Sequence, residues 1–112
     1  MTIKINGIKN FAVHLTDTEQ NIYTCSVNKA AKITHIQASN LTNEDVPLSI
    51  NLKKGENSFY FVKDLNIPAN ASAKPLGDLV GAIIMENDIL QALSNGNDKV
   101  DLILSLTEYD II

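Results

Sequence analysis

The sequence has no arginine and no tryptophan, and it has a single cysteine, Cys25, among 112 residues. Arginine binds phosphate and guanine through two parallel hydrogen bonds. Its absence, together with a net charge of −4, argues strongly against a nucleic-acid partner. One cysteine permits neither an intramolecular disulfide nor a multi-cysteine metal site.

Long hydrophobic runs are also missing. The longest, such as residues 80–85, are far shorter than the roughly 20 residues that cross a membrane, and the first twenty residues lack the basic-then-apolar order of a secretory signal. We therefore expect no membrane partner. Hydrophobic residues make up 45% and charged residues 20% of the chain, so a chain of this length is expected to fold as one domain with a real core.

The hydrophobic pattern has a period of two, which is typical of half-buried strands. Residues 46–52 and 100–106 alternate most regularly, with apolar side chains on one face and mostly polar side chains on the other. The predicted core consists of Ile36, Val46, Leu48, Ile50, Leu52, Ile84, Val100, Leu102, Leu104 and Leu106.

Turn signals recur about every ten residues, which favours an antiparallel sandwich. Residues 32–39 and 59–62 read as further strands, the second covered on both faces or lying at a subunit contact. Residues 80–85 and 88–93 read as two strands that pair with each other. Short helical turns at 86–94 and 17–20 are the alternatives. The predicted fold is all-β: a single antiparallel, jelly-roll-like β-sandwich of about eight strands over residues 21–112, preceded by an N-terminal arm or edge strand at 1–20.

No residue pattern in the sequence signals catalysis. His14 and His35 lie in apparent strands and read as surface or rim histidines, and Cys25 reads as a small buried residue. The oxygen-rich stretches 86–88 and 95–98 do not follow the ligand spacing of a calcium loop and read as turns. We therefore predict no enzyme, no catalytic residue, no cofactor and no metal.

Residues 22–36 resemble a family of small tailed-bacteriophage virion proteins. The resemblance rests on a tyrosine-threonine entry at Tyr23-Thr24, a short loop before a lysine, and an isoleucine- and threonine-rich strand leading to Asn40. It continues through the strand at 46–52, the isoleucine-proline-alanine connection at 67–72, the glycine, apolar strand and acidic turn at 81–90, and a final strand at 100–108.

The resemblance implies a structural, non-enzymatic virion component of the neck, tail or capsid surface. Its partners would be other virion proteins and copies of itself, and its location would be the virion. We predict that it acts by assembly through subunit contacts. The predicted assembly residues are apolar and lie near the termini or in the aromatic strand: Ile3, Ile5, Ile8, Phe59, Tyr60, Tyr109, Ile111 and Ile112. The alternative is a small carbohydrate-binding or adhesin module.

Overall fold

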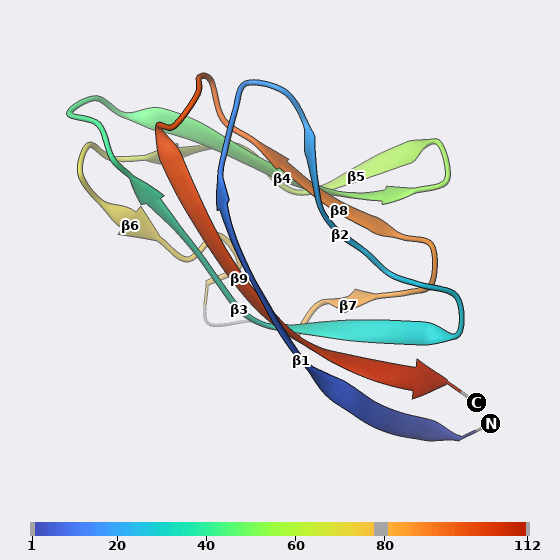
Figure 1. Ribbon diagram of the computed structural model, residues 1–112. Helices are drawn as coiled ribbons and strands as arrows, with labels where there is room; N and C mark the ends of the chain where they lie inside the picture. The colour runs from blue at the N-terminus through green and yellow to red at the C-terminus, as the bar shows by residue number, and fades with distance from the viewer. Residues whose placement is uncertain (1, 78–80, 112) are drawn as a thin grey trace.

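The computed structural model describes residues 2–77 and 81–111, and this part of the chain contains nine strands and no helix (Figure 1). The strands are β1 (Ile3–His14), β2 (Gln20–Thr24), β3 (Lys29–Asn40), β4 (Val46–Lys54), β5 (Asn57–Ile67), β6 (Ser72–Ala73), β7 (Ile83–Ile84), β8 (Ile89–Leu93) and β9 (Val100–Ile111). The predicted all-β class is therefore confirmed. Within the described residues there is also no helix long and apolar enough to cross a membrane.

The strands form two antiparallel sheets that face each other. The first sheet has the order β1-β9-β3-β6, with β7 also paired to β3, and the second has the order β2-β8-β4-β5. The chain crosses between the sheets at most connections, except that β4 and β5 form a hairpin in the second sheet and β6 and β7 both belong to the first. The first strand, β1, lies beside the last, β9. This is the wrapping of a jelly roll, as the sequence predicted.

The core lies between the sheets and contains every residue predicted for it. Leu102, Leu104 and Leu106 of β9 are at most 1% exposed, because alternate side chains of a strand point to the same face. The structure adds Leu15, Ile67 and Leu90 to this core, each fully buried.

Strand β4 differs from the expectation of one apolar and one polar face, because both of its faces are covered. Ser49 is 5% and Asn51 is 1% exposed. The Ser49 hydroxyl accepts the backbone N–H of Asp64 at 2.9 Å. The Asn51 amide donates to Gln91 Oε1 at 3.0 Å, and Gln91 Nε2 donates to Asn21 Oδ1 at 2.8 Å. An amide ladder across three strands thus satisfies the polar groups of this face.

The predicted pairing of residues 80–85 with 88–93 is wrong. Strand β7 pairs with Ala31 and Lys32 of β3 in the first sheet, whereas β8 pairs with β2 and β4 in the second. The short turn at 86–87 therefore carries the chain from one sheet to the other and is not a hairpin within a sheet. Residues 89–93 form a strand, so the helical alternative for this segment is also wrong; Val80 lies outside the described residues.

Strand β1 is an edge strand that pairs with β9 along its whole length. A β-bulge between Ile5 and Gly7 shifts the register, so that Asn6 is the extra residue. After the bulge, Phe11 and Val13 pack against the core.

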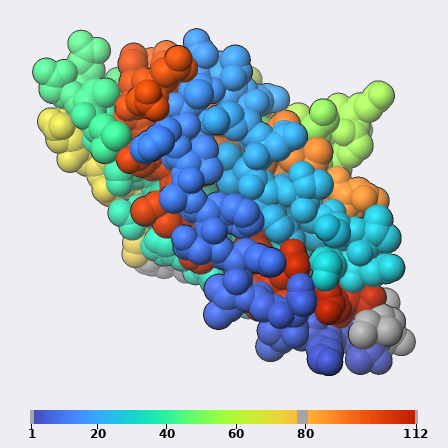
Figure 2. Space-filling view, viewed as in Figure 1, coloured from blue at the N-terminus to red at the C-terminus, as the bar shows by residue number. Residues whose placement is uncertain are grey.

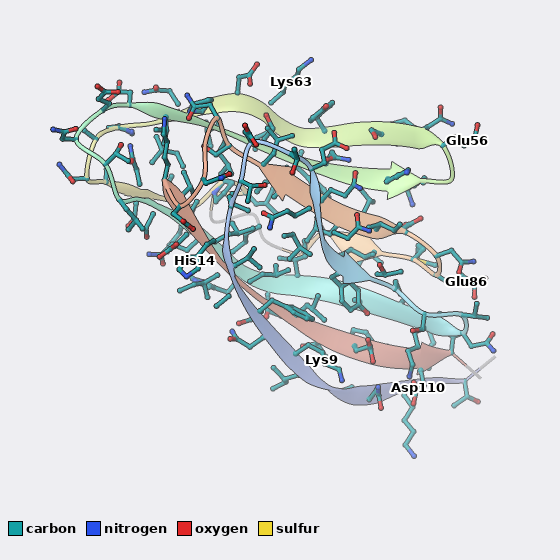
Figure 3. All side chains as sticks on the ribbon, turned by 45° about the horizontal axis from the view of Figure 1, so that its top comes forward. Lys9, His14, Glu56, Lys63, Glu86 and Asp110 are labelled. Carbon is teal, nitrogen blue, oxygen red and sulfur yellow. The ribbon has the colours of Figure 1, made fainter. Side chains whose placement is uncertain are left out.

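The sandwich has two ends. Residues 15–19, 41–45 and 94–99 connect strands at one end, where Leu15 N–H donates to the Val100 carbonyl and Leu41 N–H to the Lys99 carbonyl, both at 2.9 Å. Residues 25–28, 55–56 and 85–88 lie at the other end, together with the beginning of β1 and the end of β9. In Figure 3, His14 accordingly lies far from Glu56, Glu86 and Asp110.

Candidate assembly surface

Five of the predicted assembly residues lie together on the outer face of the first sheet. Ile3 pairs with Ile111 and Ile5 pairs with Tyr109, and cross-strand partners share a face. Ile8 pairs with Thr107 on the same face. Ile3, Ile5 and Ile8 are 64%, 67% and 80% exposed. In the space-filling view of Figure 2, β1 lies at the molecular surface over much of its length.

A groove of about 350 Å³ opens beside these residues; we call it the outer groove. Its lining is almost entirely apolar and consists of Ile3, Ala30, Lys32, Ile83, Met85, Tyr109 and Ile111. The sequence analysis missed Ile83 and Met85 because it read the apolar run 80–85 as a strand paired with 88–93 and assigned only Ile84 of this run to a face. Only Ile84 is buried, whereas Ile83 and Met85 are 49% and 45% exposed. The alternation of a strand could have indicated that the neighbours of Ile84 point outward.

The remaining predicted residues lie elsewhere. Phe59 and Tyr60 belong to β5 of the second sheet and are 57% and 45% exposed, so this strand is not covered on both faces within one chain. Phe59 is opposite Leu52 and Tyr60 is opposite Asn51. The two rings therefore point to opposite faces of the sheet and do not form a single aromatic platform. Ile112 lies outside the described residues.

The inner face of the sheet beneath the outer groove is polar, whereas its outer face is apolar. This is the reverse of the usual arrangement, in which the buried face is apolar and the exposed face polar. Glu108, which is 6% exposed, accepts hydrogen bonds from the Tyr23 hydroxyl at 2.6 Å and from the Asn6 amide at 2.7 Å. Lys29 Nζ lies 2.5 Å from Asp110 Oδ1 and 3.8 Å from Glu108 Oε1. This polar cluster joins β1, β2, β3 and β9, and sequence analysis did not find it.

The electrostatics of the polar cluster favour an ionised carboxylate. The hydrogen bond from Tyr23 lowers the pKa of Glu108 against the effect of burial, and the Asn6 amide and Lys29 act in the same direction. Burial and the bond to Glu108 raise the pKa of the Tyr23 hydroxyl. The hydrogen bond to Asp110 raises the pKa of the Lys29 ammonium group. The ionised Glu108 and Lys29 link neighbouring strands. The polar atoms of the cluster are largely paired with one another, so few hydrogen-bonding positions remain for a ligand.

The histidines and the cysteine lie where the sequence placed them. His14 is exposed at the end of β1, and its Nδ1 lies 2.5 Å from Asp101 Oδ1. His35 is partly buried on β3. Cys25 is fully buried, and its thiol donates a weak hydrogen bond to the Lys29 carbonyl at 3.4 Å.

The two oxygen-rich stretches form turns. Asp88 accepts hydrogen bonds from the Lys54 ammonium group at 2.5 Å and from the Met85 N–H at 3.1 Å, so its carboxylate is engaged within the chain. Residues 95–99 form a bend and turn between β8 and β9. In residues 2–77 and 81–111, no group of three or more histidine, cysteine, aspartate or glutamate side chains has the arrangement of a metal site.

The sequence matches no known protein family, and no curated protein matches it. Among solved structures, the chain is similar to one reported as "Bacillus endospore appendages form a novel family of disulfide-linked pili". The TM-score is 0.60 and the identity is 14%, and the match covers 99% of this chain and 90% of the other. This similarity shows that the two chains share a fold.

Two weaker similarities do not reach the level of a shared fold. The nucleoplasmin-like N-terminal domain of Drosophila FKBP39 matches with a TM-score of 0.43 and 9% identity, over 96% of this chain and 92% of that one. A chain of infectious bursal disease virus strain Gt matches with a TM-score of 0.27 and 6% identity, over 99% of this chain and 38% of the other.

Proposed function

We propose that this protein is a structural subunit that works by assembling with other subunits and performs no catalysis. The observation that carries the proposal is the inverted polarity at the outer groove: the polar cluster lies inside, and isoleucine side chains lie outside. Large apolar patches on a single subunit mark interaction sites. Complete burial of Ile3, Ile5 and Ile8 would contribute about 3–6 kcal/mol to an interface, given their exposure.

The proposed particle is a bacteriophage virion, with the subunit in its neck, tail or capsid surface. This rests on the sequence resemblance of residues 22–108 to tailed-phage virion proteins. The fold shared with the endospore-appendage chain supports an assembly role by analogy only. The disulfide link named for those pili does not transfer, because the single cysteine of this chain, Cys25, is fully buried; assembly here is non-covalent.

A mass-spectrometric inventory of purified particles, with relative copy numbers, tests the virion assignment. The expected result is a stoichiometric component present in many copies. Absence of the protein from purified particles would contradict a virion role.

Light scattering after size exclusion tests the assembly surface. Ile5→Asp should reduce assembly of the full chain, whereas Ile103→Asp, an equally drastic change on β9 away from the outer groove, should not. Deleting the whole N-terminal segment is a poorer test, since Phe11, Val13 and Leu15 belong to the packed interior. If Ile5→Asp assembles as the parent chain does, the outer surface is not the contact.

A further inference from the structure

Charge is distributed unevenly between the two ends of the sandwich. The loops 15–19, 41–45 and 94–99 contain five carboxylates and one lysine: Asp17, Glu19, Glu44, Asp45, Asp98 and Lys99. Their sum is −4, which equals the net charge of the entire chain, so the other eight lysines and eight carboxylates cancel. We call these three loops the acidic end.

Four carboxylates of the acidic end are available to a partner, whereas Asp45 accepts hydrogen bonds from the Asn66 amide at 3.2 Å and from the Ala69 N–H at 3.1 Å. All five are exposed, and none of them belongs to an ion pair within the part of the chain that the structure describes. In the same loops Leu41 is 54% exposed, and its N–H is held by the Lys99 carbonyl at 2.9 Å. The acidic end thus presents an exposed apolar side chain on the same set of loops as the exposed carboxylates.

The opposite end presents the complementary surface. The outer groove lies there, with Ala30 as its smallest lining residue and the stem of Lys32 at its side. Lys32 is exposed on the same face as the groove and forms no ion pair among the described residues. The groove volume of about 350 Å³ exceeds twice the roughly 150 Å³ of a cavity that holds benzene, so it has room for a leucine side chain.

Pairing between the β1 edges of two copies is a less favourable contact than binding of the acidic end to the groove. The bulge at Asn6 and the lysines at positions 4 and 9 interrupt the free edge of β1, and such features oppose strand addition. A groove-to-groove contact would also bring Lys32 of one copy towards Lys32 of the other. The loops at the acidic end instead offer an exposed apolar side chain that can fill the groove, and negative charge that can face Lys32.

We propose that the outer groove binds the acidic end of a second copy of this chain, with Leu41 seated in the groove and the acidic loops facing Lys32. This deepens the proposed function by naming the partner. Because each copy uses two different surfaces, the contact is heterologous and continues from copy to copy, into a ring if the rotation closes and into a filament if it does not. The molecule is 50 Å long, and the groove lies on a face, so successive copies would overlap and repeat at less than 50 Å.

The test uses two exposed substitutions that each block one surface. Leu41→Asp blocks the acidic end and Ile83→Glu blocks the groove, while Ser58→Asp adds a charge at an exposed site of β5 as a control. Circular dichroism and thermal melting should show that all three fold as the parent does. By light scattering at about 20 mM salt, the parent and Ser58→Asp should form multimers, and salt of about 500 mM should weaken these by screening.

Each blocked variant alone should assemble at least tenfold more weakly than the parent. An equimolar mixture of Leu41→Asp and Ile83→Glu should form dimers and stop, because one intact groove meets one intact acidic end. A parent that stays monomeric at both salt concentrations, or a mixture that forms no dimer, would overturn the proposal. If Ile83→Glu abolishes assembly and Leu41→Asp does not, the groove has another occupant, and the proposed assembly role stands without this partner.

Discussion

The hydroxyl of Tyr23 donates a 2.6 Å hydrogen bond to the carboxylate of Glu108, which lies 85 residues later in the chain and in the opposite sheet. This bond joins the two sheets within the polar cluster. A buried hydrogen bond to a charged group contributes more than a neutral one, at about 1.5–3 kcal/mol.

We predict that Tyr23→Phe lowers the free energy of unfolding by about 1.5–3 kcal/mol, because Glu108 loses a donor where water has little access. Urea unfolding followed by circular dichroism measures the change. Tyr60→Phe is the control, since Tyr60 is 45% exposed on β5 and should leave the midpoint unchanged. Equal stabilities of the two variants would show that the tie contributes nothing.

The same bond predicts a pH dependence below neutrality. The pKa of Glu108 is lowered in the folded state from its ordinary value of 4.5, so the unfolded chain binds a proton more readily. The stabilisation is complete above about pH 4.5 and is lost as the pH falls through the lower folded value. Unfolding at a series of pH values should therefore show a smaller acid loss for Tyr23→Phe than for the parent; parallel curves would disprove the assignment.

Two neighbouring residues of β9 should respond in opposite ways to the same change. Leu104 is fully buried, whereas Ile103 is 44% exposed on the outer face. Leu104→Asp should prevent folding, because burying an unpaired carboxylate costs several kcal/mol, a large part of the stability of a small domain. Ile103→Asp should fold with a melting temperature within a few degrees of the parent. A folded Leu104→Asp would contradict the assignment of the inner face.

Cys25 should remain a free thiol in the native protein. It is fully buried, and burial raises the pKa of its thiol, so little thiolate forms near neutral pH. A thiol reagent should label it slowly in the native state and rapidly in denaturant. A disulfide-linked dimer on non-reducing electrophoresis of native protein would contradict this prediction.

His14 should titrate above 6.5, because its hydrogen bond to Asp101 raises its pKa. The pair contributes its full stabilisation below pH 6.5 and loses it as the pH rises through the folded value. Nuclear magnetic resonance titration of the ring protons measures the midpoint, and Asp101→Asn should lower it. An unchanged midpoint in Asp101→Asn would show that the pair does not form in solution.

The core could be predicted from the sequence because alternation is local information. In β9, the positions of Val100, Leu102, Leu104 and Leu106 fix the buried face without any knowledge of the partner strands. The partners of β7 and β8 could not be predicted in the same way, because two adjacent apolar segments read alike whether they pair with each other or cross between sheets.

The assembly surface was predicted only in part, for a related reason. The apolar character of Ile3 and Ile5 is visible in the sequence, but their shared face with Tyr109 and Ile111 depends on pairing across more than 100 residues. The polar cluster beneath them brings together Asn6, Tyr23 and Glu108. No spacing rule relates such distant positions, so only the fold reveals it.

The placement of β9 between β1 and β3 has a consequence for the order in which the fold can form. Strand β1 precedes the other described strands in the chain, yet the strand beside it, β9, is the last of them. The first sheet therefore lacks its central strand until β9 has been synthesised. The pairings of this sheet are long-range, as in proteins that fold slowly. During synthesis Ile3, Ile5 and Ile8 stay exposed on an unpaired strand. The completion of β9, as much as the strength of individual contacts, then limits when the first sheet can form.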